Sequence, residues 1–345
     1  MFLLKIIFLL ISFINTSSLI ENYPKRENFQ TELNGKKVDL YFLTNSNGYE
    51  ISITNYGGII VSIMIPNNNN QFENILQSYS SIEEYIHNSN QKNKNKINSL
   101  LGQYANQIKD NEFILDNKTY KLNNSNYISN LGEIVWTPVQ INSSELRLYY
   151  TSQEGENGFP GKLHIEVIYC LNDNNEFKIS YTAITTQKTV INLSQRLFFN
   201  LNGDINQEIN NHILYLNSKL YLPSDENKIP SGDIKLIDNT IYDFKKGKKL
   251  GEQNLDDYFI LDKKICDKNK KYNFGGLLED KKSGRKIEMY TTEPGVHIIS
   301  DKLGISIEPK HFPNSPNVGF FPSTILKPGD LYKKETIYRF NMEKD

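Results

Sequence analysis

Residues 162–170 (KLHIEVIYC) and residues 176–184 (EFKISYTAI) decide the fold class of this chain. In both stretches apolar side chains recur at every second position, which is typical of a half-buried β-strand. The sequence between them contains residues 172–175 (NDNN), and Asn and Asp favour tight turns. The two stretches are therefore predicted to form an antiparallel hairpin.

The same alternation continues through most of the chain, whereas no comparably long stretch has the spacing of an amphipathic helix. A short helix is predicted at residues 81–87, where two glutamates follow a capping serine. Further strands are predicted at residues 38–44, 49–54, 59–65, 145–151, 212–216, 286–291, 304–308 and 336–342. The pattern predicts an all-β chain folded as an antiparallel sandwich, and no linker, repeat or change of composition divides it.

Length and charge limit the classes of protein that the chain can belong to. With 345 residues, of which 38% are hydrophobic, it can bury a large core. The net charge is -1, and no basic run suggests contact with nucleic acid. Nucleic acid is therefore not expected as a partner.

Residues 1–18 have the layout of a secretory signal peptide. Lys5 precedes the apolar run 6–14, and residues 16–18 (TSS) are small and polar. A membrane anchor is the alternative, but this run is shorter than the ~20 residues needed to span a bilayer. We expect cleavage near Ser18, secretion without membrane attachment, and a mature domain covering residues 19–345.

Secretion would make two further features relevant. Glycans are expected at three of four sequons, the exception being Asn192, which lies in a stretch expected to face the functional site. The three are Asn117, Asn123 and Asn142. Two cysteines, Cys170 and Cys266, do not make a disulfide framework. Both are predicted to be buried and unpaired.

Residues 189–201 (TVINLSQRLFFNL) and 304–316 (GISIEPKHFPNSP) resemble the two signature strands of the aldose 1-epimerase, or galactose mutarotase, family. Other family-like motifs follow in the family's order, so the resemblance covers nearly the whole chain. They are residues 53–58 (ITNYGG), 154–161 (EGENGFPG), 229–232 (IPSG), 239–244 (NTIYDF) and 326–329 (LKPG). The resemblance implies a galactose mutarotase-like β-sandwich with a sugar site on a concave face. It also implies interconversion of the α and β anomers of an aldohexose such as galactose or glucose.

Mutarotation needs one group that takes a proton from the anomeric hydroxyl and another that donates a proton to the ring oxygen. Glu308, in residues 307–310 (IEPK), matches the family's general base. The family's general-acid histidine corresponds to Arg196, which remains charged and cannot shuttle a proton. The family's second histidine, in a Leu-His-Gly-Gly stretch, has no counterpart in residues 130–136 (NLGEIVW). The general-acid chemistry of the family is therefore expected to be impaired.

The resemblance also assigns candidate sugar-binding residues. Asp256 matches a carboxylate that binds sugar hydroxyls, Asn106 is retained, and the arginine that follows it in the family is Gln107 here. His297 replaces a glutamine near the site and is either a substitute acid or an ordinary strand histidine. Arg196 could hold a sugar hydroxyl, but we expect it to pair with Glu308 or Asp256 and to lower the pKa of that carboxyl group.

Three hypotheses remain open at the level of sequence. The chain could be an aldose 1-epimerase homologue with impaired catalysis, a non-catalytic protein that binds an aldohexose or a terminal saccharide, or a scaffold whose outer surface matters. No Gly-rich phosphate loop and no His and Cys spacing typical of a metal site is present. Neither a cofactor nor a metal is expected, and oligomeric state is not predicted.

Overall fold

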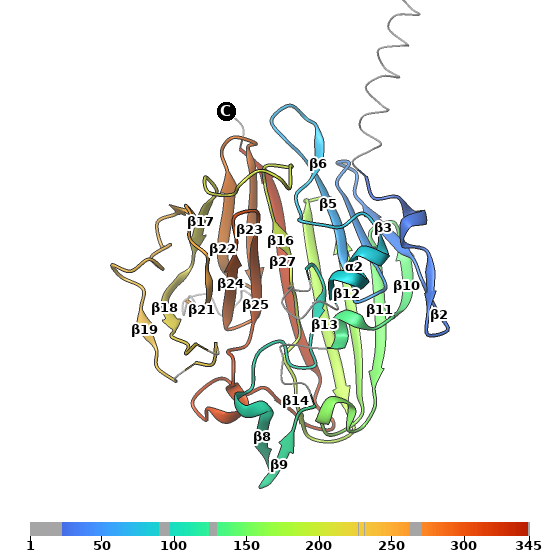
Figure 1. Cartoon of the computed structure of the whole chain (residues 1–345), viewed down its shortest axis with the longest axis vertical. Helices are drawn as coiled ribbons and strands as arrows, with labels where there is room; N and C mark the ends of the chain where they lie inside the picture. Colours follow the sequence, from blue (N-terminus) through green and yellow to red (C-terminus); the bar gives the residue numbers. More distant parts are fainter. Residues whose placement is uncertain are drawn as a thin grey trace, which may run out of the picture.

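A computed structural model describes residues 23–89, 97–123, 130–226, 228–230, 232–262 and 271–343. The named strands in these residues pair in antiparallel fashion, and they form three larger sheets and several two-stranded ones (Figure 1). The all-β antiparallel prediction is confirmed.

The largest sheet contains the predicted hairpin. Its two strands are β12 (Leu163–Leu171) and β13 (Glu176–Thr185), and Val167 lies opposite Tyr181 in their register. The sheet has nine strands in the order β10, β11, β12, β13, β27, β23, β22, β17 and β20. The remaining members are β10 (Thr137–Asn142), β11 (Glu145–Ser152), β27 (Tyr332–Met342), β23 (Arg285–Thr291), β22 (Asn273–Asp280), β17 (Ile213–Leu216) and β20 (Lys248–Lys249).

The second sheet has six strands and places the signature residues side by side. Its order is β16, β25, β24, β21, β18 and β19. The register pairs Tyr258 with His297 and His297 with Glu308 across three neighbouring strands. The members are β16 (Phe198–Phe199), β25 (Ile305–Lys310), β24 (Gly295–Ser300), β21 (Asp256–Leu261), β18 (Ser218–Leu222) and β19 (Lys235–Leu236).

The third sheet packs against the only α-helix among the described residues. Its strands are β3 (Leu40–Thr44), β4 (Glu50–Thr54), β5 (Ile60–Pro66) and β6 (Phe72–Asn74). The helix is α2 (Ile82–Ser89), and its Ile82 and Tyr85 pack with Ile59 and Val61 in a separate apolar cluster. The alternation along β5 sends Ile60 to the opposite side, into the main core.

Four two-stranded sheets complete the fold. They are β1 (Thr31–Leu33) with β2 (Lys36–Val38), β7 (Leu100–Leu101) with β15 (Ser194–Gln195), β8 (Glu112–Leu115) with β9 (Lys118–Lys121), and β14 (Thr189–Val190) with β26 (Ile325–Leu326). The β8–β9 hairpin projects from the lower end of the molecule in Figure 1.

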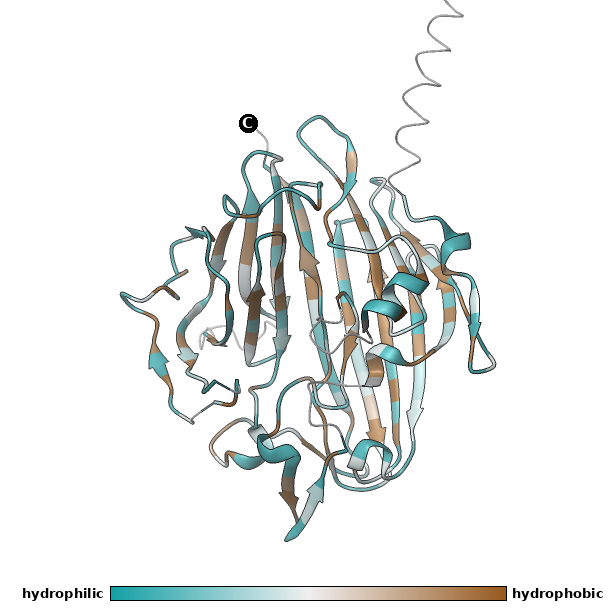
Figure 2. Cartoon of the chain, viewed as in Figure 1, coloured by the Kyte–Doolittle hydropathy of each residue, from teal (hydrophilic) through white to brown (hydrophobic). Residues whose placement is uncertain are grey.

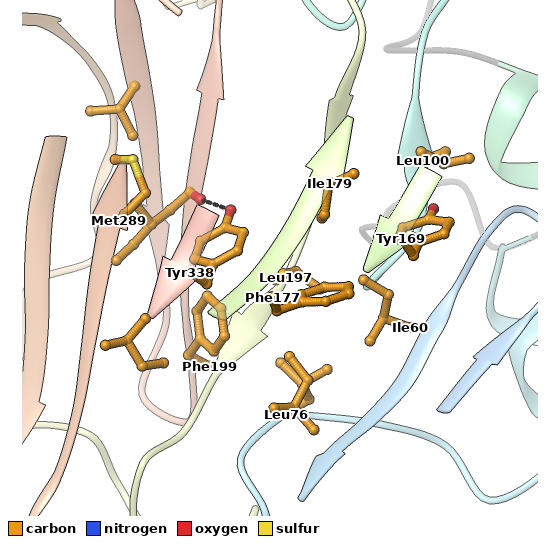
Figure 3. Packing of buried hydrophobic residues seen from close by; sticks show 14 of the residues in the cluster. Ile60, Leu76, Leu100, Tyr169, Phe177, Ile179, Leu197, Phe199, Met289 and Tyr338 are labelled. Carbon is orange, nitrogen blue, oxygen red and sulfur yellow. Dashed lines mark hydrogen bonds between the residues drawn. The ribbon is translucent and has the colours of Figure 1, made fainter. Parts of the chain in front are cut away.

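The main core takes apolar side chains from all three larger sheets. Brown and teal alternate along the strands in Figure 2, as the period-two sequence pattern requires. In Figure 3, Leu197 and Phe199 lie with Phe177 and Tyr338 in this core. Fully burying each such side chain stabilises the fold by about 1.5–3 kcal/mol. Leu197 and Phe199 therefore anchor the signature segment in the core directly after Arg196.

The predicted elements agree with the observed ones except at particular ends. The stretch predicted as 38–44 is interrupted at Asp39, whose backbone N–H donates to Asn55 Oδ1 at 2.9 Å instead of continuing a ladder. Strand β27 begins at Tyr332, four residues before the predicted start. No helix in the described part of the chain is long and apolar enough to cross a membrane.

The prediction that Cys170 is buried is wrong. The side chain is partly exposed, because β12 alternates and Cys170 lies between the buried Tyr169 and Leu171, on the opposite face. The thiol makes no disulfide. Cys266 lies outside the described residues, as do residues 1–18, for which a signal peptide is predicted.

Candidate functional site

Glu308 is at the centre of the candidate site and is 0% exposed. The alternation of β25 sends Ser306, Glu308 and Lys310 to one face, while Ile305 and Ile307 enter the core. Glu308 Oε1 accepts a hydrogen bond from Ser306 Oγ at 3.0 Å, and its Oε2 accepts one from Lys310 Nζ at 2.6 Å. The carboxylate is therefore held from both sides by residues of its own strand.

Arg196 binds the same carboxylate from a different part of the chain. Its Nε lies 2.5 Å from Glu308 Oε1 and its Nη2 lies 3.5 Å from Oε2. The backbone N–H of Arg196 donates to the carbonyl oxygen of Ser99 at 3.0 Å, which fixes the start of the side chain. The pairing expected for Arg196 is formed, and Glu308 is its partner.

These contacts set the protonation state of the pair. Burial raises the pKa of the Glu308 carboxyl group, but the charges of Arg196 and Lys310 outweigh it and hold this pKa well below its usual value. Burial, together with the Arg196 charge, lowers the pKa of the Lys310 ammonium group below its usual value although Glu308 acts to raise it. Glu308 is thus ionised and a weak base, because taking up a proton would break two ion pairs.

His297 lies between two carboxylates. Its Nε2 is 2.7 Å from Asp256 Oδ1, and its Nδ1 is 3.7 Å from Glu308 Oε2. The second oxygen of Asp256 is 3.2 Å from Lys228 Nζ. Although burial raises the pKa of Asp256, His297 and Lys228 together lower it below the ordinary value. Both ring nitrogens of His297 thus face protein carboxylates.

Tyr258 joins Asn106 to His297. Tyr258 Oη donates to Asn106 Oδ1 at 2.5 Å, and Asn106 Nδ2 donates to the carbonyl oxygen of His311. The Tyr258 ring is stacked on the His297 ring, with centroids 3.8 Å apart and planes inclined by 12°. The two polar atoms of the Asn106 amide therefore already have protein partners.

The structure thus brings together Glu308, Arg196, His297 and Asp256, with Asn106 joined to them through Tyr258. Gln107 makes no hydrogen bond or ion pair with this group among the contacts of the described residues. Its carbonyl oxygen accepts from the Asn314 N–H at 2.8 Å, and its side-chain Oε1 is buried without a hydrogen-bond partner among the described residues.

Sequence reasoning missed Lys310, Tyr258, Ser306 and Lys228. Ser306 had a period-two signal, because it lies two residues before Glu308 on the strand predicted at 304–308, whereas Lys310 lies two residues after Glu308, beyond the predicted end of that strand. Tyr258 likewise lies two residues after Asp256. Lys228 lies between β18 and β19, outside any predicted strand, and had no such signal. In the described ranges no group of three or more His, Cys, Asp or Glu residues could hold a metal ion.

The chain is thus an antiparallel β-protein in which Glu308 on β25 is paired with Arg196, and Asp256 lies two strands away on β21. The family described as Aldose 1-epimerase matches residues 39–339. The chain belongs to the aldose 1-epimerase family.

Characterised relatives match along most of their length. Galactose mutarotase of Sus scrofa is 28% identical over 328 residues, which is 87% of this chain and 94% of the relative. Aldose 1-epimerase of Escherichia coli (strain K12) is 27% identical over 347 residues, covering 90% and 97% of the two chains.

Solved structures show the same fold. The aldose epimerase homologue from C. elegans superposes with a TM-score of 0.80 at 22% identity, covering 89% of this chain and all of the other. Galactose 1-epimerase from Lactobacillus acidophilus NCFM gives a TM-score of 0.75 at 21% identity, covering 91% and 98%. The galactose mutarotase-like fold predicted from the sequence is confirmed.

Proposed function

We propose that this protein binds an aldohexose such as galactose or glucose and that it is a strongly impaired aldose 1-epimerase. The observation that carries the proposal is the complete burial of Glu308 between Arg196 and Lys310. A carboxylate in this state holds its charge and has little tendency to take a proton from an anomeric hydroxyl.

The donor side of the reaction is also weak. Arg196 cannot release a proton near neutral pH, and His297 is hydrogen-bonded to Asp256 through Nε2. A positioned general acid or base contributes about 10²- to 10⁴-fold to a rate. A site with a free general acid would accelerate anomer exchange more, and we expect the rate with this protein to be lower by about 10²- to 10⁴-fold.

Sugar binding is supported by the polar groups nearest to solvent. The side chains of Asp256 and Lys228 are 39% and 40% exposed, respectively, whereas Glu308 behind them is fully buried. Asp256 supplies partly exposed carboxylate oxygens, and the buried residues of the same group supply an amide, at Asn106, and a flat ring, at His297. These are the kinds of group that hold a small polar ligand.

Two measurements on the purified protein test the proposal. Saturation-transfer NMR gives the rate of anomer exchange of galactose and glucose with the wild type, with Glu308→Gln, and with buffer alone. Calorimetric titration gives the affinity for each sugar. Binding with exchange close to the buffer rate supports the proposal. Full mutarotase rates that Glu308→Gln abolishes would contradict the impairment, and absence of binding to both sugars would favour the scaffold hypothesis.

We also propose that the protein is secreted, with residues 1–18 removed, and carries glycans. The exposure of Asn117 and Asn142 supports this, since both are at hairpin turns or strand ends. Asn123 is exposed too. Asn192 is 0% exposed and cannot be reached by a modifying enzyme in the folded protein. Mobility shifts after glycosidase treatment, compared between wild type, Asn117→Gln and Asn142→Gln from culture medium, check the proposal.

A further inference from the structure

We infer that Tyr258 is a gate that closes the candidate site, and that its side chain must leave the Asn106 and His297 contacts before a sugar can bind there. The part of this inference that concerns sugar rests on the proposed function. The closure itself rests only on the contacts of the protein.

Tyr258 occupies the position between two candidate sugar-binding residues. Its hydroxyl is bonded to Asn106 Oδ1 at 2.5 Å, and its ring covers one face of the His297 ring at 3.8 Å. The register of β21 and β24 places Tyr258 and His297 directly opposite each other, so the stack follows from the strand pairing. One side chain therefore takes up the groups that would otherwise meet a ligand.

Tyr258 also lies over the charged part of the site. The Lys310 Nζ atom, which donates to Glu308, is 5.6 Å from the centre of the Tyr258 ring. Lys310 is 1% exposed and Tyr258 is 7% exposed. A cation beneath an aromatic ring is attracted to the ring face, which stabilises this arrangement.

The apolar neighbours of Tyr258 belong to a small cluster separate from the main core. Leu222, Phe312 and Phe321 pack with it. The Phe321 ring also contacts the exposed Phe320 ring, with the two ring centroids 5.0 Å apart. Beyond its contacts at the site, the Tyr258 ring packs in this small cluster, so its displacement disturbs less apolar packing than displacement of a side chain in the continuous core.

Closure lowers the apparent affinity for a ligand of the open site. If the open arrangement is populated at about a tenth or less, the apparent Kd is about 10-fold or more above the intrinsic value. Removing the ring therefore tightens binding instead of weakening it. A Tyr258 side chain that served as a stacking platform for the sugar would have the opposite effect.

The test compares wild type with Tyr258→Ala, and uses a readout that needs no sugar. Brief treatment with acetic anhydride followed by peptide mass spectrometry measures the reactivity of the Lys310 amine against that of exposed Lys109. Tyr290→Ala is the matched control, because Tyr290 is a partly exposed tyrosine on β23 whose hydroxyl contacts Glu288. Circular dichroism checks that each variant is folded, and Tyr258→Phe, which keeps the ring and loses only the hydroxyl, provides a milder change.

We expect Lys310 to react about 10-fold or more faster in Tyr258→Ala, to be unchanged in Tyr290→Ala, and to be intermediate in Tyr258→Phe. Galactose or glucose should bind Tyr258→Ala about 10-fold more tightly. Unchanged protection of Lys310 in Tyr258→Ala overturns the gate whatever the sugar does, and so does weaker sugar binding by that variant. If Lys310 becomes reactive while neither protein binds either sugar, the gate is supported and the proposed function fails.

Discussion

Arg196 and Glu308 form a buried ion pair in which Arg196 Nε lies 2.5 Å from Glu308 Oε1. The side chains are 6% and 0% exposed, so water cannot replace either partner. The two residues are 112 positions apart, and the pair joins the two signature segments of the chain. The sequence resemblance assigns these two residues to the positions of the family's general acid and general base, so the pair is the main determinant of the proposed impairment.

Replacing Arg196 with histidine is expected to restore part of the mutarotase reaction. Imidazole can donate a proton near neutral pH, and its introduction frees Glu308 Oε1 from the guanidinium group. We expect anomer exchange of galactose to accelerate by about 10²- to 10⁴-fold over the control Arg196→Gln, which breaks the pair without supplying an acid. Saturation-transfer NMR at matched protein concentration checks this. Equal rates for the two variants would show that the missing acid is not what limits the reaction.

Replacing Glu308 with glutamine is expected to destabilise the protein. The change leaves the buried Arg196 and Lys310 charges without their partner, which typically costs about 3–5 kcal/mol. Urea unfolding followed by fluorescence measures the loss. The control is Glu176→Gln, whose partner Arg339 is 40% exposed at 2.7 Å, and which should cost about 0–1 kcal/mol. A similar small cost for both variants would mean that the Glu308 pairs contribute nothing net.

Replacing Asp256 with asparagine is expected to weaken sugar binding. The change removes the charge that holds His297 and Lys228 and one acceptor for sugar hydroxyls, and hydrogen bonds to charged groups contribute about 1.5–3 kcal/mol. The Kd for galactose should rise about 10-fold or more. Asp257→Asn is the matched control, since the adjacent carboxylate points to the other face of β21. If titration calorimetry found the larger loss of affinity for Asp257→Asn, the sugar site would lie on the other face of β21.

Acid pH should affect two buried glutamates in opposite directions. Burial raises the pKa of Glu293, and Lys334, 3.2 Å away, offsets this only in part. For Glu335, burial raises the pKa, but hydrogen bonds from Lys271 and Tyr272 outweigh it and lower the pKa. A raised carboxyl pKa means that the folded state binds the proton more readily, so the penalty at Glu293 is present at neutral pH and is lost as pH falls through its folded pKa.

Glu293→Gln is therefore expected to be more stable than wild type at pH 7, and the difference should shrink as the pH is lowered below the folded pKa towards the ordinary value of 4.5. Glu335→Gln should be less stable than wild type at pH 7, and its deficit should shrink only as the pH falls below 4.5 towards the lowered folded pKa. Urea midpoints at a series of pH values measure both. Destabilisation of similar size in the two variants at pH 7 would contradict the assignment for Glu293.

The strands could be predicted because each is a local pattern. Residues 162–170 and 176–184 alternate so regularly that their hairpin, and hence the all-β class, follows from the sequence. The end of the strand at Asp39 could not be predicted in this way. It depends on a hydrogen bond to Asn55, 16 residues away, which competes with the strand ladder for a backbone group.

The sequence by itself determined the fold class, the family, and the positions at which Glu308, Asp256 and Asn106 stand, because these depend on residue types in order along the chain. Only the tertiary structure decided the partners. The lateral order and register of strands β21, β24 and β25 decide which residues meet at the site. They decide that Arg196 and Lys310 bind the same carboxylate, and that Tyr258 covers His297. That register is set by packing between sheets, which no local pattern contains.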